Sequence, residues 1–407
     1  MERIKLSEIA YLLNGYAFKS AKYVERGIRI IRIANVQDGY IADDKPCYYP
    51  LCTDEDISKY MLTENDLLIS LTGNVGRVGM LTKGFLPAAL NQRVSCIRIK
   101  DSDTVNKKYL YYYFRQKLFI QECVEASKGV AQLNLSTKWL ENYTIPVPPL
   151  PEQERIVARI EELFSQLDAG VETLKKTKAQ LAVYQQAVLK EAFEGRLTAS
   201  GPEKIVRLGD YIETPRYGTS KKCSYDDGRD RTAVYRIPNI DHKNGRISHD
   251  DIKYAQFTES ELDGIRLQQG DILIIRSNGS VSLVGRAAMV CDADITGTFA
   301  GYLMRLRISE PETLLPKFLL LFLQSHQARI YIENKAKSTS GVHNINSTEI
   351  SDLQMPLYDP DTQYAIIEAI ESRLSVCDSI EQTVDTALQQ AEAMRQSILK
   401  DAFEGRL

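Results

Sequence analysis

The sequence has few of the features that would place it in a membrane or in an oxidising compartment. Its longest uninterrupted apolar run covers only residues 318–323, whereas a membrane-spanning helix needs about 20 apolar residues. The first ten residues lack the basic and then apolar pattern of a secretory signal. The seven cysteines are irregularly spaced and include no CxxC pair, a pattern that favours reduced thiols. We therefore expect a cytoplasmic protein without disulfides.

The motifs of most catalytic sites are missing too. There is no GxxxxGK[ST] loop, and the glycines at 73, 76 and 79 are spaced GxxGxxG instead of GxGxxG. A methyltransferase would need a cofactor glycine motif and an Asn/Asp-Pro-Pro-aromatic loop, and neither occurs. Residues 250–253 contain a DxK that lacks the second acidic position of a metal-dependent nuclease, so we expect a polar turn there. Four histidines and scattered cysteines give no zinc spacing. We expect no metal, no cofactor and no catalytic activity in this chain.

The net charge of −3 differs from that of a strongly basic nucleic-acid binder, but the charge is unevenly distributed. Residues 1–150 carry +4, residues 151–200 carry −1, residues 201–356 are neutral and residues 357–407 carry −6. The acidic excess lies mostly in the last segment, so the others can still present a basic face. The small surplus predicts modest DNA affinity for the chain alone, with partners supplying the rest.

An internal repeat organises the chain. Residues 145–197 align without a gap onto residues 355–407, and LKEAFEGRL at 189–197 differs from LKDAFEGRL at 399–407 at one position. The preceding segments match more loosely, at positions such as Arg32, Ile33 and Asn35 against Arg236, Ile237 and Asn239, Asp66 against Asp271, and Gly129, Val130 and Asn134 against Gly341, Val342 and Asn346. The order is therefore head, helix, head, helix.

Both repeated segments have the apolar pattern of long coiled-coil helices. Apolar residues recur in alternating steps of four and three from Ile156 to Val188 and again from Ile366 to Ile398, with Gly170, Thr177 and Arg373 as the exceptions. Prolines at 148, 149 and 151 predict the start of the first helix, and the glycines at 195 and 405 predict where each helix ends. The two seams can bury each other, and each helix of about 40 residues would be about 60 Å long.

The heads have shorter, β-rich runs separated by Gly, Asn and Asp turns, followed by helical segments near 106–126 and 315–335. We predict a mixed α/β (α+β) fold with two heads in a pseudo-two-fold arrangement, separated by the two helices. The expected domains are the first head at 1–150, the first helix at 151–200, the second head at 201–356 and the second helix at 357–407.

Several segments together resemble the specificity (S) subunits of type I restriction-modification systems, over nearly the whole chain. They are NGYAFKS at 14–20, residues 30–36, the run from Asp66 into the glycines at 73, 76 and 79, PLPEQERI at 149–156 and the repeated AFEGRL. The chain departs from this pattern in two places. DPDTQYAI at 359–366 stands where PLPEQERI is expected, and TPRYGTS at 214–220 stands where NGYAFKS is expected.

The resemblance implies the function and the partners. Each head would be a target-recognition domain that recognises one half of a bipartite site in double-stranded DNA. The two long helices would form an antiparallel coiled coil that sets the spacer between the halves. Two methyltransferase (M) subunits would bind around the coiled coil, and restriction (R) subunits would complete the complex. S-adenosylmethionine, ATP and Mg would be bound by those partners, and adenine methylation is the expected modification.

Base edges are recognised by Arg, Lys, Asn and Gln side chains on loops, while phosphates take basic groups, hydroxyls and backbone N–H groups. The alternative for any such residue is that Asn closes a turn and Arg is a solvated surface charge. The DNA-binding candidates of the first head are Asn74, Arg77, Gln92, Arg93, Lys128, Gln132 and Asn134. Those of the second head are Arg276, Asn278, Ser280, Arg286, Lys337, His343, Asn344 and Asn346.

Two pairs that the heads share are expected to be scaffold, because heads that recognise different half-sites should differ at base contacts. These pairs are Arg32 with Arg236 and Asn35 with Asn239. The AFEGRL segments allow two interpretations, a helix C-cap or a docking patch for methyltransferase subunits formed by Phe193, Arg196, Phe403 and Arg406. The aromatic run at 109–114 could stack bases, but on a helix it is expected to be core.

Two other functions stay open on the sequence alone. One is a non-DNA-binding coiled-coil scaffold with two protein-binding heads, which the modest charge allows. The other is a fragment of a fused restriction-methylation enzyme, whose catalytic motifs would lie in adjoining sequence.

Overall fold

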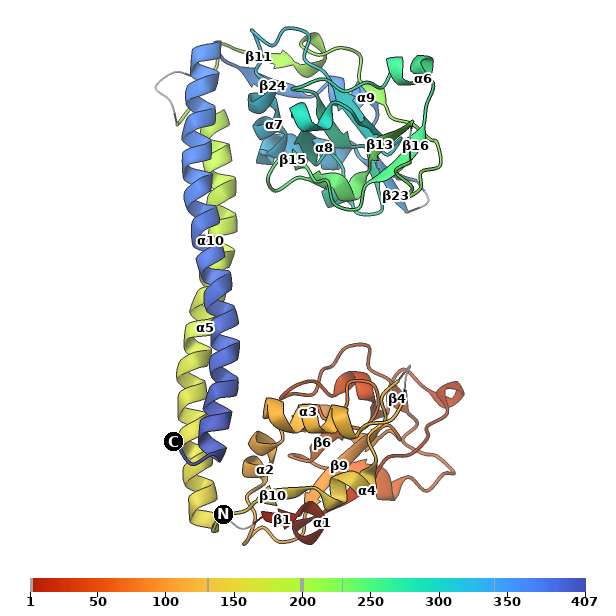
Figure 1. The fold of residues 1–407 in the computed structure, drawn as a ribbon, viewed down its shortest axis with the longest axis vertical. Helices are drawn as coiled ribbons and strands as arrows, with labels where there is room; N and C mark the ends of the chain where they lie inside the picture. Colours follow the sequence, from red (N-terminus) through yellow and green to blue (C-terminus); the bar gives the residue numbers. More distant parts are fainter. Residues whose placement is uncertain (1–2, 130–131, 198–200, 229, 340) are drawn as a thin grey trace. The chain divides into compact units, whose positions relative to one another are not determined.

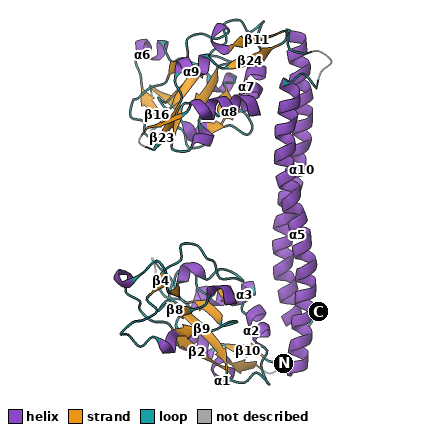
Figure 2. Ribbon diagram, turned by 180° about the vertical axis from the view of Figure 1, so that it is seen from behind, coloured by secondary structure: helices purple, strands orange, loops and turns teal. Residues whose placement is uncertain are grey.

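The computed structural model describes residues 3–129, 132–197, 201–228, 230–339 and 341–407. The chain divides into two compact units, Met1–Leu174 with Asp385–Leu407, and Lys175–Val384. Each unit contains one head and parts of both long helices (Figures 1 and 2). In the described residues, no helix is both long and apolar enough to cross a membrane.

The first head contains two four-stranded sheets and short helices. One sheet has the order β2 (Ala10–Asn14), β9 (Val94–Ile99), β6 (Leu67–Ser70), β7 (Val78–Met80), and the other has the order β4 (Tyr48–Tyr49), β3 (Ile28–Ile31), β8 (Ala88–Leu90), β5 (Met61–Leu62). A third pairing joins β1 (Arg3–Lys5) to β10 (Thr144–Pro146). The helices are α1 (Leu6–Ile9), α2 (Lys107–Tyr113), α3 (Lys117–Ala126) and α4 (Thr137–Asn142).

The second head repeats this design with more strands. Its largest sheet has the order β12 (Arg216–Tyr217), β21 (Leu303–Leu306), β17 (Ile272–Ile275), β19 (Ala287–Met289), β15 (Arg246–Ile247), β14 (Ile240–Asp241). Smaller sheets are β16 (Lys253–Gln256), β13 (Arg231–Tyr235), β20 (Thr298–Phe299); β18 (Ser277–Asn278), β23 (Val342–Asn344), β22 (Lys337–Thr339); and β11 (Lys204–Arg207), β24 (Gln354–Leu357). The helices are α6 (Glu259–Asp263), α7 (Pro316–Gln324), α8 (His326–Lys335) and α9 (Ser347–Ser351). The predicted mixed α/β class is confirmed.

The long helices are α5 (Leu150–Phe193) and α10 (Pro360–Phe403), which lie side by side in Figures 1 and 2. Asp168 pairs with Arg395 in one unit, and Lys178 lies 3.3 Å from Glu381 in the other. One residue number rises as the other falls, so the helices are antiparallel, as predicted. Most seam positions are at least half-buried, but Gly170, Tyr184, Ile380 and Met394 are exposed, so the predicted seam was wrong at these positions.

Both helices end as their glycines predict. Gly195 and Gly405 have φ of +72° and +75°, a left-handed conformation that favours glycine. The next amide in each case bonds back across the last turn, from Arg196 N to Glu191 O at 2.9 Å and from Arg406 N to Asp401 O at 2.8 Å. This pattern is a Schellman cap, which satisfies carbonyl groups at the end of a helix.

A buried glutamine joins each head to the start of the helix that follows it. Gln153 Oε1 accepts the N–H of Asn106 at 2.8 Å, and its Nε2 donates to the carbonyls of Thr104 and Pro148 at 3.0 and 2.7 Å. Gln363, 210 residues later, makes the same three bonds to Leu315 N, Thr313 O and Tyr358 O at 2.9, 2.8 and 2.8 Å. Both side chains are fully buried. In each case Oε1 accepts the backbone N–H of the residue that precedes a helix of the head, α2 or α7.

A buried ion pair is also repeated. Asp66 accepts two hydrogen bonds from Arg98, and Asp271 accepts two from Arg307, each of the latter at 2.7 Å. Both carboxylates are nearly inaccessible to solvent. The hydrogen bond to Asp271 raises the pKa of Arg307. The sequence match between Asp66 and Asp271 therefore reflects a shared structural role.

Candidate nucleic-acid interface

The backbone hydrogen bonds of the two heads show which residues occupy equivalent positions. In the first head, Tyr16 N donates to Leu90 O at 2.8 Å and Gln92 N donates to Tyr16 O at 3.0 Å. In the second head, Thr219 N donates to Phe299 O at 2.8 Å and Gly301 N donates to Thr219 O at 2.7 Å. Tyr16 is therefore equivalent to Thr219, and the turn at 91–93 is equivalent to the turn at 300–302.

A second pair of bonds extends the equivalence. Leu71 N donates to Arg93 O at 3.1 Å, and Arg276 N donates to Tyr302 O at 3.0 Å. On the other side, Leu135 N donates to Leu71 O at 2.8 Å, and Ile345 N donates to Arg276 O at 2.9 Å. Leu71 is thus equivalent to Arg276, and Arg93 to Tyr302.

This equivalence corrects two sequence matches. Gly15 corresponds to Gly218, three positions later than the comparison of NGYAFKS with TPRYGTS placed it. A Cβ at Gly15 would lie 2.1 Å from the carbonyl oxygen of Asn91, and one at Gly218 would lie 2.2 Å from that of Phe299. Likewise Asn134 corresponds to Asn344 and not to Asn346. The unequal lengths of the intervening loops hid both matches.

The structure brings the candidate loops of the first head together. Thr72 donates its hydroxyl hydrogen to Asn134 Oδ1 at 3.0 Å, and Gly73 N donates to Leu133 O at 2.8 Å, so the loop after β6 lies against residues 132–135. Asn74, Gln92, Arg93, Lys128 and Gln132 are exposed. Arg77 is half-buried and donates to Gln37 Oε1 at 2.9 Å.

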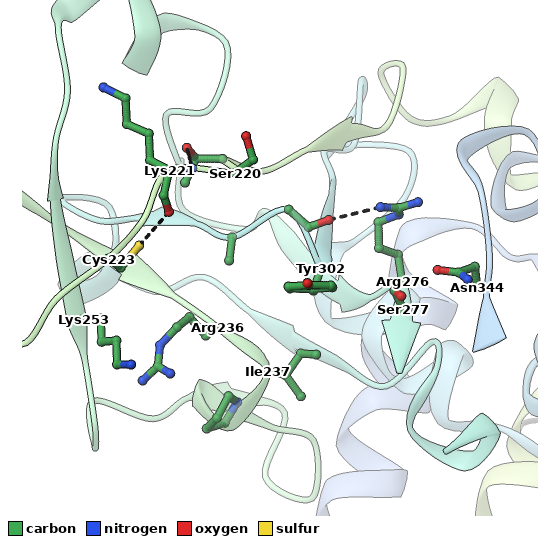
Figure 3. Close-up of a pocket in the computed structure, with 14 residues that line it drawn as sticks. Ser220, Lys221, Cys223, Arg236, Ile237, Lys253, Arg276, Ser277, Tyr302 and Asn344 are labelled. Atoms are coloured by element: carbon green, nitrogen blue, oxygen red, sulfur yellow. Dashed lines mark hydrogen bonds between the residues drawn. The ribbon is translucent and has the colours of Figure 1, made fainter. Parts of the chain in front are cut away.

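In the second head, the equivalent loops line a cavity of about 710 Å³ (Figure 3). Arg276, Ser277 and Asn344, from the paired strands β18 and β23 and the residue before them, lie on one side of it. The Arg276 guanidinium stacks 4.4 Å from the ring centroid of Tyr217 and donates from Nη1 to Gly301 O at 3.2 Å. The stacking and the hydrogen bond hold this cation in a defined orientation at the cavity.

The remaining candidates of the second head lie elsewhere or have local partners. Arg286 lines a different cavity, beside Gln186 of α5 and Asp378 of α10, and burial lowers its pKa. Asn346 caps α9 by accepting from Glu349 N at 2.8 Å. Asn278 accepts from Ser280 N, and His343 contacts Ala336 O. The side chain of Lys337 lies outside the described residues.

Sequence reasoning missed several residues that line the cavity around Arg276. Lys221, Arg236 and Lys253 add positive charge to it, and Tyr302 is 63% exposed there. Lys221 Nζ donates to Glu261 at 2.7 Å, and this bond is the main reason that the pKa of Glu261 is lowered to about 2. Tyr302 had no signal of its own in the sequence, because its role follows from its equivalence to Arg93.

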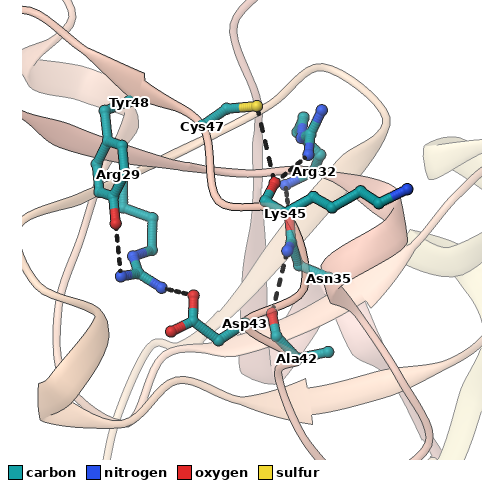
Figure 4. A network of polar contacts seen from close by, with 8 residues as sticks. All are labelled: Arg29, Arg32, Asn35, Ala42, Asp43, Lys45, Cys47 and Tyr48. Carbon is teal, nitrogen blue, oxygen red and sulfur yellow. Dashed lines mark hydrogen bonds and ion pairs between the residues drawn. The ribbon is translucent and has the colours of Figure 1, made fainter. Parts of the chain in front are cut away.

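The shared Arg–Asn pairs have a structural role, as predicted. Asn35 accepts the N–H of Arg32 at 2.9 Å and donates to Ala42 O at 3.0 Å, while Arg32 Nη2 donates to Lys45 O at 2.8 Å (Figure 4). In the second head, Asn239 makes the corresponding bonds, accepting the N–H of Arg236 at 2.9 Å and donating to Ser248 O at 3.1 Å. Both asparagines are buried.

The AFEGRL phenylalanines contact the heads of this same chain. Phe193 is buried against Phe318 and Phe322 of α7, each with a ring-centroid distance of 5.3 Å. Phe403 packs against Tyr109 and Tyr113 of α2 at 5.1 and 5.2 Å. The aromatic run of α2 is therefore core, as predicted. Arg196 and Arg406 remain exposed and pair with acidic residues of their own segments.

Comparison with known proteins shows which proteins the chain resembles. Residues 1–182 match the type I restriction modification DNA specificity domain. The EcoBI and EcoKI type I restriction enzyme specificity subunits of Escherichia coli are 27% and 25% identical to this chain, over 100% and 99% of it and 86% and 88% of their own lengths. The chain is thus similar over nearly its whole length to the specificity subunits of type I restriction enzymes.

Solved structures of type I specificity subunits share the fold. A chain from a structural study of complex assembly and conformational transition in a type I restriction-modification system has a TM-score of 0.74 at 17% identity, covering 100% of this chain and 98% of that one. The HsdS subunit of Thermoanaerobacter tengcongensis has a TM-score of 0.53 at 16% identity, covering 100% and 97%. The chain thus has the fold of these solved structures.

Proposed function

We propose that each head of this specificity subunit recognises one half of a bipartite DNA target, and that the cavity around Arg276 and the equivalent surface of the first head contact the bases. The observation that carries the proposal is the common backbone frame of the two heads. The frame is the same at Tyr16 and Thr219, at Leu71 and Arg276, and at Arg93 and Tyr302, yet the side chains differ. Two heads with one scaffold and different side chains at equivalent positions are suited to different half-sites.

The remaining parts of the complex follow from the family. Methyltransferase subunits bind around α5 and α10, and restriction subunits join them in the full cytoplasmic complex. S-adenosylmethionine, ATP and Mg belong to those partners, and the specificity subunit has no catalytic activity. The exposed Arg196 and Arg406 are the docking candidates that the intramolecular packing of Phe193 and Phe403 leaves accessible.

The proposal is tested by co-expressing the chain with the methyltransferase subunit of its system and mapping modified bases across the host genome by single-molecule sequencing. Two short specified halves around a fixed gap are the expected result. A complex that forms but adds no methylation would favour the protein-binding scaffold. Methyl transfer by the purified chain alone would contradict the absence of catalysis.

The role of the helices is tested by changing their length. One heptad inserted into both helices, after Lys178 and after Glu381, keeps the apolar seam in register and adds about 10 Å to each helix. Because B-DNA rises about 34 Å per 10 to 10.5 base pairs, we expect the gap to lengthen by about three base pairs. An unaltered gap would show that the helices do not set it.

A further inference from the structure

Three positions whose backbone hydrogen bonds are equivalent in the two heads carry different side chains, and we call them the frame positions. In the first head they are Tyr16, Leu71 and Arg93, and in the second head they are Thr219, Arg276 and Tyr302, in the same order. Each head therefore has one tyrosine and one arginine, but on different positions of the same frame.

The neighbours of these positions are alike in both heads. Asn134 and Asn344 are equivalent, the hydroxyl residues Thr72 and Ser277 pair with them in the strand register, and Gly15 and Gly218 make the same close approach to a carbonyl. At these three positions the two heads thus differ in side chains that equivalent backbone carries. A phosphate contact is needed equally by both heads, whereas a base contact must differ if the half-sites differ.

We propose that Arg276 in the second head and Arg93 in the first determine base specificity, and that each recognises a guanine. This inference rests on the proposed function. An arginine can donate two hydrogen bonds to guanine O6 and N7, the commonest specific contact in the major groove. Arg276 is suited to this role because Tyr217 and the Gly301 carbonyl orient its guanidinium at the cavity. Arg93 is exposed on the equivalent surface of the first head.

The test uses the complex of the full chain with its methyltransferase and a panel of duplexes in which each specified base pair is changed singly. The wild-type complex should discriminate against a changed G·C pair by about 5- to 150-fold in Kd. Arg276→Leu introduces the residue that the equivalent position of the first head already carries, so the frame tolerates it. We expect this variant to lose discrimination at one G·C pair in one half of the target and to keep it elsewhere.

Arg93→Leu should do the same in the other half. Arg266→Leu is the matched control, because Arg266 lies in the second head with its half-exposed side chain paired to Glu259. This control should keep discrimination at every pair. Thermal unfolding and complex formation with the methyltransferase confirm that each variant is folded.

Two results would overturn the inference. The first is an Arg276→Leu complex that retains discrimination at every base pair. The second is an Arg276→Leu complex that binds all duplexes more weakly by the same factor, since uniform weakening identifies a phosphate contact. A wild-type complex that binds no split target would instead contradict the proposed function itself, so the two failures are distinguishable.

Discussion

Replacing Gln363 by leucine should loosen the second head from the start of α10. The side chain is fully buried and makes three hydrogen bonds of 2.8 to 2.9 Å, to one amide and two carbonyls. At about 1 kcal/mol for each bond, the variant should lose about 3 kcal/mol of the free energy of unfolding of the second unit. The loss is larger if the three partner groups stay buried without water, because an unpaired buried polar group costs about 1–3 kcal/mol.

Two measurements distinguish the loss of the contact between Gln363 and the second head from a general loss of stability. Denaturant unfolding gives the free energy of unfolding. Hydrogen exchange reports directly on the backbone N–H of Leu315, which donates to Gln363 Oε1. In the variant this amide should exchange much faster, while amides of the buried strand β17 should change only as far as global stability does. Methylation of targets whose gap is one base pair too long or too short should also rise relative to the native gap.

Gln166→Leu is the matched control, because Gln166 is an exposed glutamine on α5. Surface substitutions usually change stability by no more than about 0.5 kcal/mol. The equivalent variant Gln153→Leu should act on the first unit in the same way, through the amide of Asn106. A loss of less than about 1 kcal/mol in the free energy of unfolding for Gln363→Leu, with unchanged hydrogen exchange at Leu315, would refute the proposed role of Gln363.

Three further variants test other contacts. Asp271→Asn should cost about 3 kcal/mol of stability in denaturant unfolding, because it leaves Arg307 without its buried partner; a loss near zero would show that water replaces the carboxylate. Phe193→Ala should cost about 3 kcal/mol by removing the ring from between two α7 phenylalanines, whereas Arg196→Ala should leave stability unchanged and weaken methyltransferase binding; equal effects on stability would contradict this division. The pKa of Glu261 is lowered to about 2 in the folded chain, whereas its value in the unfolded chain is about 4.3. Its contacts therefore stabilise the folded chain at pH values above about 4.3, and this stabilisation is lost as the pH falls toward 2. Glu261→Gln should therefore flatten the acid limb of the pH–stability profile, and an identical profile would rule the contacts out.

The two long helices and their ends could be predicted from sequence because their signals are local. An apolar period of 3.5 residues defines a helix with a buried stripe, and a glycine with positive φ ends it. The predicted seam was wrong at Tyr184, Ile380 and Met394, which fit the apolar pattern but have exposed side chains. The pattern gives the side of the helix, and only packing decides how much of it is buried.

The candidate site was only partly predictable. The structure brings together the loops that carry several of the Arg, Asn and Gln candidates in each head, and their contact with DNA stays a prediction. Arg286 and Asn346 have the right chemistry but face other surroundings, a cavity beside the long helices and the cap of α9. Tyr302, Lys221 and Lys253 were missed because nothing in their local sequence shows that they meet at one cavity.

The sequence by itself determined the order of heads and helices and the scaffold role of Asn35 and Asn239, since each depends on a repeat or a short-range period. The equivalence of Arg276 with Leu71 and of Tyr302 with Arg93 was decided only by the tertiary structure. Loops of unequal length shift the sequence register, while backbone hydrogen bonds between distant strands keep the frame constant. The function of the buried glutamines likewise emerged only when each helix start was seen against its own head.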